Sequence, residues 1–213
     1  LIKQITSGNW NVTDYYGYDP VLKVHYLQTT LGGPLNRVLA KVDARGNVVK
    51  ISGETGTYSA QFSKNFSSYV QKYSDVKTPP RYAIFNNRGK KVRDLEQNSK
   101  YAAKYTASNI PVKEFFTFEN DGYELNGYMI KPVDFDASRK YPVILSQYSG
   151  PGSQKVLNSW KMEWEQFFAM QGYIVVSVDG RGTGGRGKKF ASTVYMQLGK
   201  YESIDLCAAA DYM

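Results

Sequence analysis

Apolar and polar side chains alternate in short stretches through residues 1–110. In 22–27 and 38–42 most apolar residues occupy every second position, which is the pattern of half-buried β-strands. Clusters of turn-forming residues separate such stretches, at 32–34, 44–47, 78–80 and 86–89. We therefore predict that this half of the chain is built from β-strands.

The same features occur twice in this half. The sequence Asn36-Arg37-Val38, a strand and Arg45-Gly46 recurs about 40 to 45 residues later as Pro80-Arg81-Tyr82, a strand and Arg88-Gly89. A repeat of this length, holding about four short strands, is typical of propeller blades. The pattern predicts about two blades.

A β-hairpin is predicted just after Pro111, where the pattern changes. The β-rich runs 112–118 and 123–130 flank Asn120-Asp121-Gly122. Asp-Gly between two such runs is a strong hairpin signal, because both central residues can adopt positive φ.

Buried strands and helices are predicted to alternate through the rest of the chain. The runs 141–147 and 173–178 are apolar throughout most of their length, whereas 156–170 and 201–213 have apolar residues at helical spacing. Hairpin, strand, helix, strand and helix together favour an α/β sheet with parallel members.

The counts of reactive residues limit the chemistry. One cysteine, Cys207, excludes an internal disulfide, and one histidine, His25, excludes a His/Cys zinc site, so we expect no metal or other cofactor. His25 lies in an alternating strand and no G-x-S-x-G sequence occurs, so we interpret it as a strand-surface residue. Cys207, in an apolar helical stretch, is interpreted as a packing residue.

Charge and hydropathy narrow the range of partners. The net charge is +8, and the basic excess lies in residues 1–110, where Lys and Arg are scattered with no run longer than Lys90-Lys91. We therefore expect no nucleic-acid partner, although a basic chain would suit one. No run of about 18 apolar residues is present, so no membrane span is expected. The first residues include neither Met nor a signal core, which suggests the cut end of a longer chain or a processed product.

A glycine-rich run follows the strand at 173–178. Gly180 to Gly185 fits G-x-G-x-x-G, with Asp205 at the distance of a ribose-binding acid, and 182–188 fits a P-loop without its final hydroxyl residue. The residues 186–189 are expected to break any helix at that point, which argues against the dinucleotide fingerprint. The missing hydroxyl removes the Mg²⁺ ligand of a P-loop, which argues against the other interpretation. A turn-rich loop at the end of a strand is the alternative.

Tyr148 is the candidate catalytic residue. It follows the strand at 141–147 and precedes a Gly-Pro-Gly turn, at the carboxyl end of a strand, where open α/β sheets bind ligands. A phenol, with a reference pKa near ~10, stays protonated at neutral pH and can donate a hydrogen bond to an oxyanion. A tyrosine that only packs is the alternative.

These segments resemble the dipeptidyl peptidase IV branch of the prolyl oligopeptidase family. The resemblance covers essentially the whole chain and rests on KYPVIL at 140–145, QYSGPGSQ at 147–154, VDGRGTG at 178–184, and the β-rich segments 56–66 and 93–98. It implies that residues 1–110 are the C-terminal blades of an eight-bladed β-propeller and that 111–213 are the N-terminal part of an α/β-hydrolase domain. The lack of cysteine pairs makes the chain similar to bacterial members.

The resemblance also implies a function. Members are serine exopeptidases that release N-terminal X-Pro or X-Ala dipeptides from peptides with a free N-terminus. From the resemblance, the full-length protein is expected to be a homodimer that is periplasmic, located in the cell envelope, or secreted. Tyr148 matches the oxyanion tyrosine of the family. The serine, aspartate and histidine of the triad would lie beyond Met213, so we expect the 213 residues alone to be inactive.

Two other functions fit parts of the sequence. The β half alone would suit a non-catalytic module that binds peptides, with the second half as scaffold. A nucleotide-binding domain built on 180–188 would follow from the glycine-rich run.

Overall fold

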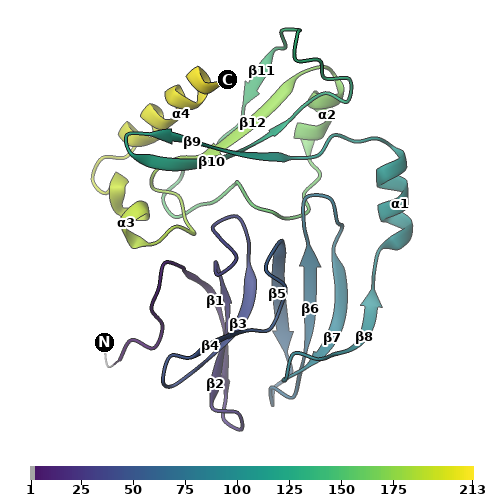
Figure 1. Cartoon of the computed structure of the whole chain (residues 1–213), viewed down its shortest axis with the longest axis vertical. Helices are drawn as coiled ribbons and strands as arrows, with labels where there is room; N and C mark the ends of the chain where they lie inside the picture. The colour runs from purple at the N-terminus through teal and green to yellow at the C-terminus, as the bar shows by residue number, and fades with distance from the viewer. Residues whose placement is uncertain (1–2) are drawn as a thin grey trace. The chain divides into compact units, whose positions relative to one another are not determined.

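The computed structural model describes residues 3–213 (Figure 1). The chain divides into two compact units. One extends to Ala102 and includes Leu157–Trp160, and the other comprises Ala103–Val156 and Lys161–Met213. We call them unit 1 and unit 2 and describe each by itself. Within residues 3–213, no helix combines the length and the apolar character needed to cross a bilayer.

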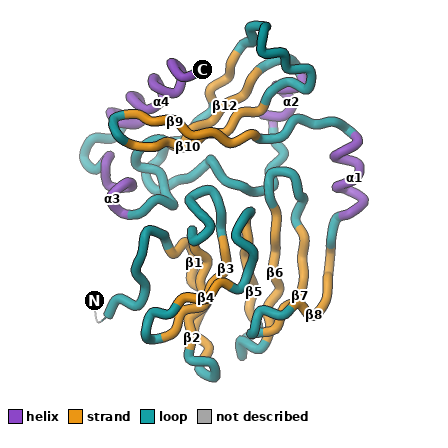
Figure 2. The backbone as a smooth tube through the Cα atoms, in the orientation of Figure 1, coloured by secondary structure: helices purple, strands orange, loops and turns teal. Residues whose placement is uncertain are grey.

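Unit 1 contains two four-stranded antiparallel sheets, seen as the orange strands β1 to β8 in Figure 2. The first contains β1 (Val12–Asp19), β2 (Val24–Thr29), β3 (Val38–Asp43) and β4 (Val48–Lys50), in that order, and the second contains β5 (Thr57–Phe62), β6 (Ser68–Ser74), β7 (Arg81–Asn86) and β8 (Lys91–Glu96). The prediction of a β-rich first half is confirmed. In each sheet, neighbouring strands are consecutive along the chain, which agrees with the turn signals that recur between the predicted strands.

Aromatic rings from the two sheets pack against one another inside unit 1. The Tyr26 side chain is fully buried, and its ring centroid lies 4.4 Å from that of Phe62, which in turn lies 4.8 Å from that of Tyr69. The Tyr26 hydroxyl donates a hydrogen bond to the carbonyl oxygen of Asn87. Such aromatic pairs add stabilisation beyond the area that they bury.

Helix α1 (Ser99–Ala107) was not predicted. None of its side chains is buried, so it lacks the fully buried face that makes a helix easy to predict from apolar spacing. Its first residues, up to Ala102, belong to unit 1 and the rest to unit 2.

Unit 2 is built on a mixed sheet with the order β11-β12-β10-β9. Its strands are β9 (Glu114–Asn120), β10 (Tyr123–Ile130), β11 (Val143–Leu145) and β12 (Ile174–Asp179). The predicted hairpin is confirmed: β9 pairs antiparallel with β10, and Asp121 and Gly122 have φ of 50° and 74°. The predicted parallel pair is also present, between β11 and β12. Phe118, Leu125, Val176, Val178, Phe190 and Ala209 form its buried core.

The prediction of a helix over 156–170 is wrong for its first half. Helix α2 covers only Trp164–Met170. The reason is that Asn158 bonds within unit 1 instead of along a helix: its backbone N–H donates to the carbonyl oxygen of Leu35 at 2.8 Å, and its side chain accepts from the N–H of Val76 at 3.2 Å.

The last helix, α4 (Lys200–Tyr212), confirms the prediction for 201–213. Its buried residues are Glu202, Asp205 and Ala209. Cys207 is exposed, so its interpretation as a packing residue is wrong. The buried face of α4 is set by the two acids and their partners rather than by the apolar residues around Cys207. Before α4 lie the short helix α3 (Lys188–Ala191) and the 3-10 turn η1 (Ser192–Val194).

Candidate active site

Tyr148 lies on the loop formed by residues 146–155, which follows β11 directly. We call this segment the tyrosine loop. The Tyr148 side chain is 72% exposed, and no hydrogen bond of its hydroxyl is found within residues 3–213. Gly150 lies against the ring: a Cβ at Gly150 would be 2.9 Å from Cε1 of Tyr148. The phenol is therefore free to donate a hydrogen bond, and its place depends on the loop backbone.

A surface pocket of about 400 Å³ opens beside Tyr148. It is lined by Gln147, Tyr148 and Ser149 from the tyrosine loop, and by Gly199, Glu202, Ser203 and Leu206 at the start of α4. The carboxylate of Glu202 accepts a hydrogen bond from the N–H of Gly199 at 3.0 Å. The polar rim of this pocket is thus partly engaged in capping the helix, whereas the phenol is not engaged.

Asp179, the last residue of β12, holds the end of the tyrosine loop. Its Oδ1 accepts the N–H of Lys155 at 2.9 Å and its Oδ2 accepts the N–H of Val156 at 2.8 Å. Asp179 is only 6% exposed. A buried carboxylate that accepts two backbone N–H groups makes charge-assisted bonds that are stronger than neutral ones.

Two backbone hydrogen bonds join the middle of the tyrosine loop to the glycine-rich turn at 180–187. The N–H of Gly152 donates to the carbonyl oxygen of Gly182 at 2.9 Å, and the N–H of Gly184 donates to that of Ser153 at 2.8 Å. A Cβ at Gly184 would lie 2.5 Å from the carbonyl oxygen of Gly152. Glycine is required at 184 because the two backbones approach so closely.

Lys155 connects the two ends of the tyrosine loop to a buried acid. Its Nζ hydrogen-bonds the hydroxyl of Ser146 and lies 3.0 Å from Glu165, which is 1% exposed. Glu165 also accepts the hydroxyl of Tyr128 at 2.9 Å and lies 3.8 Å from Nζ of Lys113. Burial, followed by the charge of Glu165, raises the pKa of Tyr128 far above its usual range. Burial lowers the pKa of Lys113.

The charges of the glycine-rich turn are paired within unit 2. Arg181, 3% exposed, donates to the fully buried Asp205 at 2.7 Å and to Asp121 at 3.0 Å. Its guanidinium lies near the rings of Tyr123 and Tyr201, 5.3 and 4.7 Å from their centroids. The hydrogen bonds to Asp205 raise the pKa of Arg181.

This pairing disfavours a nucleotide site. Asp205, which would bind a ribose in a dinucleotide fold, is fully buried and bound to Arg181. Gly185 lies outside any helix, as expected. However, the expectation that 186–189 break every helix is wrong, because α3 begins at Lys188, directly after Gly187 with φ of 88°. The glycine at 187 starts the helix instead of preventing it.

His25 lies on β2, where its Nδ1 shares a hydrogen bond of 3.0 Å with the hydroxyl of Tyr15. The rings of Tyr15 and Tyr18 flank it. Its nearest polar partner is a phenol, and no carboxylate bond is found for it in residues 3–213. This environment agrees with the interpretation of a strand-surface histidine.

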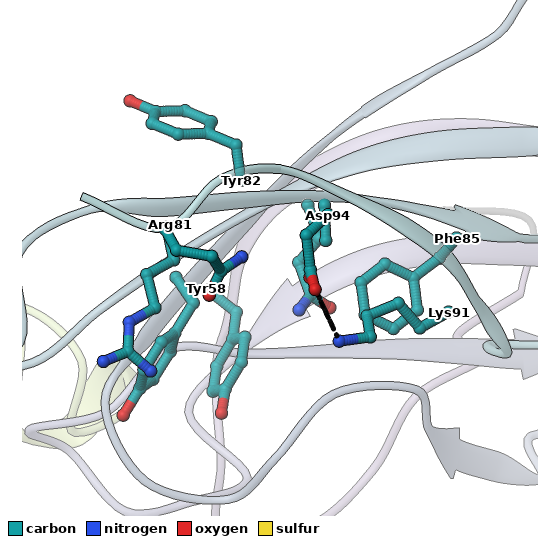
Figure 3. A pocket seen from close by; sticks show the side chains of 10 residues that line it. Tyr58, Arg81, Tyr82, Phe85, Lys91 and Asp94 are labelled. Carbon is teal, nitrogen blue, oxygen red and sulfur yellow. Dashed lines mark hydrogen bonds and ion pairs between the residues drawn. The ribbon is translucent and has the colours of Figure 1, made fainter. Parts of the chain in front are cut away.

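A second pocket, of about 190 Å³, lies on the second sheet of unit 1 (Figure 3). Figure 3 shows Tyr58, Arg81 and Phe85 around it, together with the ion pair between Lys91 and Asp94, whose Nζ and Oδ1 are 3.0 Å apart. Aromatic walls with a cation at the rim are suited to a small ligand with an apolar body and an acidic group.

The sequence profile of the family described as "Dipeptidyl peptidase IV (DPP IV) N-terminal region" matches residues 1–80, and that of the "Prolyl oligopeptidase family" matches residues 160–213. The crystal structure of Porphyromonas gingivalis dipeptidyl peptidase 4 superposes with a TM-score of 0.92 at 42% identity, over 98% of this chain and 30% of that one. The chain belongs to the dipeptidyl peptidase IV branch of the prolyl oligopeptidase family.

Curated fungal relatives of this family agree. The proteins named "Probable dipeptidyl-aminopeptidase B" from Chaetomium globosum and Arthroderma benhamiae are 36% and 34% identical to this chain over 97% and 98% of its length. This chain spans only 23% and 24% of theirs, about a quarter. Because these relatives are fungal, the bacterial origin that we inferred stays a prediction.

Tyr148 was proposed from the sequence as a candidate, but the residues that support its loop were not. In particular, no role was expected for Asp179, within the VDGRGTG segment. A signal was available, since an aspartate at the end of a buried strand must bind N–H groups or a cation to offset its desolvation.

Proposed function

We propose that this chain is part of a serine dipeptidyl peptidase that releases N-terminal X-Pro or X-Ala dipeptides. In this proposal, residues 1–110 are the last blades of a β-propeller and 111–213 are the first part of an α/β-hydrolase domain. The family membership and the four-stranded antiparallel repeats of unit 1 support it. A homodimeric whole enzyme stays a prediction.

In the proposed reaction, a serine hydroxyl attacks the carbonyl carbon of the second residue of the peptide. A histidine takes the proton of the serine, and the carbonyl oxygen becomes an oxyanion. The Tyr148 hydroxyl and a backbone N–H beside the serine donate hydrogen bonds to this oxygen. The histidine gives this proton to the leaving amine as the intermediate collapses and releases the shortened peptide, and water then hydrolyses the dipeptidyl ester to free the dipeptide and the serine.

One observation carries the proposal. Tyr148 is an exposed phenol without an intramolecular hydrogen bond in residues 3–213, on a loop that other residues hold in place, beside a pocket of about 400 Å³. A preorganised donor of this kind is what a developing oxyanion needs, because it requires no reorganisation during the reaction. The triad would come from outside the 213 residues, in which no G-x-S-x-G sequence occurs.

The test is Tyr148→Phe in the complete enzyme, assayed with Gly-Pro and Ala-Pro chromogenic amides. We expect kcat to fall by about 10² to 10³, the range for loss of one oxyanion donor, with little change in KM. The 213-residue chain alone should show no turnover. An unchanged kcat in the folded variant would remove the assigned role.

A second candidate function is non-catalytic peptide binding by unit 1. The pocket of about 190 Å³ in Figure 3 favours it, since Tyr58 and Phe85 offer apolar walls and Arg81 offers a cation. Titration of the chain with short peptides, followed by calorimetry, tests it. Saturable binding that Arg81→Gln abolishes would support this candidate, and no heat at millimolar peptide would exclude it.

A further inference from the structure

The place of the Tyr148 phenol is determined by backbone contacts at a distance from its own side chain. The ring is largely exposed, and its hydroxyl has no partner in the described part of the chain. The contacts that hold the loop instead involve the backbone of residues 152–156. Any group that fixes those backbone atoms therefore helps to hold the loop that carries the phenol.

Asp179 makes the strongest of these contacts. It ends β12, an interior strand of the sheet that pairs with both β10 and β11. A carboxylate on such an element has a well-defined position, and each of its oxygens receives one N–H from the end of the loop. The two bonds orient both Lys155 and Val156, which a single acceptor could not do.

The start of the tyrosine loop is fixed by the same strand. The N–H of Ser146 donates to the carbonyl oxygen of Val176 at 2.7 Å, which extends the parallel pairing by one residue past β11. Strand β12 thus holds the loop before Tyr148 through Val176 and after it through Asp179. The residues between these contacts form a closed segment whose two ends are attached to one rigid element.

Resting on the proposed function, we propose that Asp179 is a positioning residue for Tyr148, which it keeps in line with the oxyanion. It touches neither the substrate nor the reacting atoms. Its carboxylate acts through the backbone of Lys155 and Val156. On this view the VDGRGTG segment supports the oxyanion donor: the glycine at 184 lets the loop lie against it, and the carbonyl oxygen of Gly182 accepts an N–H from the loop.

The test variant is Asp179→Asn in the complete enzyme. Asparagine keeps the size of the side chain but presents an amide NH2 to one of the two N–H groups, so one bond is lost. A misplacement of about 1 Å can cost as much as 10²-fold in rate. We expect kcat to fall by about 10- to 100-fold, with KM changed less than about threefold.

A double-mutant cycle separates positioning from a general structural role. If Asp179 acts through Tyr148, adding Asp179→Asn to Tyr148→Phe lowers kcat by less than about twofold more, because the donor is already lost. Full additivity of the two losses would overturn the positioning role. The matched control is Asp136→Asn, which removes a carboxylate that accepts the N–H of Ser138 at 2.9 Å on an exposed turn. This control should leave kcat unchanged.

The two proposals fail in different ways. If Tyr148→Phe leaves kcat unchanged, the proposed role of the phenol fails. If Tyr148→Phe lowers kcat but Asp179→Asn does not, only the positioning role fails. A measurement on the unmodified protein covers the case of a variant that does not fold: the amide protons of Lys155 and Val156 should exchange with solvent as slowly as those of β12. Exchange at the rate of an open loop would overturn the proposal.

Discussion

The tyrosine loop and the glycine-rich turn both follow strands of the same sheet, and both contain glycines, yet their side chains are used in opposite ways. In the glycine-rich turn, Arg181 is 3% exposed and bound to two acids, whereas in the tyrosine loop Tyr148 is 72% exposed and its hydroxyl is free within residues 3–213. The glycine-rich turn, whose sequence matches known binding motifs, is therefore a structural support, whereas the tyrosine loop, which matches none of them, carries the candidate site.

The largest effect on the free energy of unfolding is expected from a substitution at Arg181. Replacing it in Arg181→Met leaves Asp205, fully buried, without its cation. Breaking a buried ion pair on one side typically costs about 3 to 5 kcal/mol. We expect a loss of this size in the free energy of unfolding of the 213-residue chain, measured by urea denaturation.

The matched control for this experiment is Lys131→Met. It breaks the partly exposed pair between Lys131 and Glu114, whose Nζ and Oε2 are 2.7 Å apart. Such surface pairs contribute about 0 to 1 kcal/mol. Equal losses in the two variants would contradict the view that the glycine-rich turn is a structural support.

A smaller effect is expected from pH, through Tyr128, the buried phenol of unit 2. Its folded-state pKa lies above the ordinary value of 10.0, since burial and Glu165 disfavour the phenolate. The stability that it contributes is complete below pH 10 and is lost as pH rises further, because only the unfolded state then releases the proton. The limiting slope for one such group is about 1.4 kcal/mol per pH unit.

Denaturation at a series of alkaline pH values measures this slope. Lys113, whose pKa burial lowers, acts in the opposite direction as pH approaches its ordinary value of 10.5, so the Tyr128 slope is measured above that value. Tyr128→Phe should reduce the slope. An identical slope in the variant would show that Tyr128 is not protected from ionisation in the folded state.

The smallest effect is expected at Tyr148 itself. Its side chain is mostly exposed and its hydroxyl has no bond to lose within residues 3–213, so Tyr148→Phe should change the free energy of unfolding by less than about 0.5 kcal/mol. A loss above about 1 kcal/mol in thermal or urea unfolding would indicate a structural tyrosine. Together with Arg181→Met, this variant tests whether stability and the candidate site are assigned to different turns.

The sequence predicted the elements whose pattern is local. Period-2 alternation located the β-rich first half, and Asp121-Gly122 located the hairpin through the positive φ that both residues adopt. The strand and loop that carry Tyr148 were placed correctly because a buried strand followed by Gly-Pro-Gly leaves few alternatives.

The errors have a common physical cause, which is tertiary contact. Apolar spacing predicted a helix from residue 156, but Trp160 packs against Tyr101 in unit 1, and Asn158 bonds to the same unit. Cys207 was assigned to the core because its neighbours are apolar, whereas the buried face of α4 is determined by Asp205 and its partner Arg181. In both cases the contacting residues are distant in the sequence, so a local sequence pattern could not reveal these contacts.

In the proposed function, the Tyr148 phenol donates a hydrogen bond to the tetrahedral oxyanion. The most direct measurement is a crystal structure of the complete enzyme with a dipeptide boronate bound to its serine. We expect Oη of Tyr148 to lie about 2.7 to 3.1 Å from the boronate oxygen that stands in for the oxyanion. A phenol turned away from that oxygen, beyond hydrogen-bond distance, would contradict the claim.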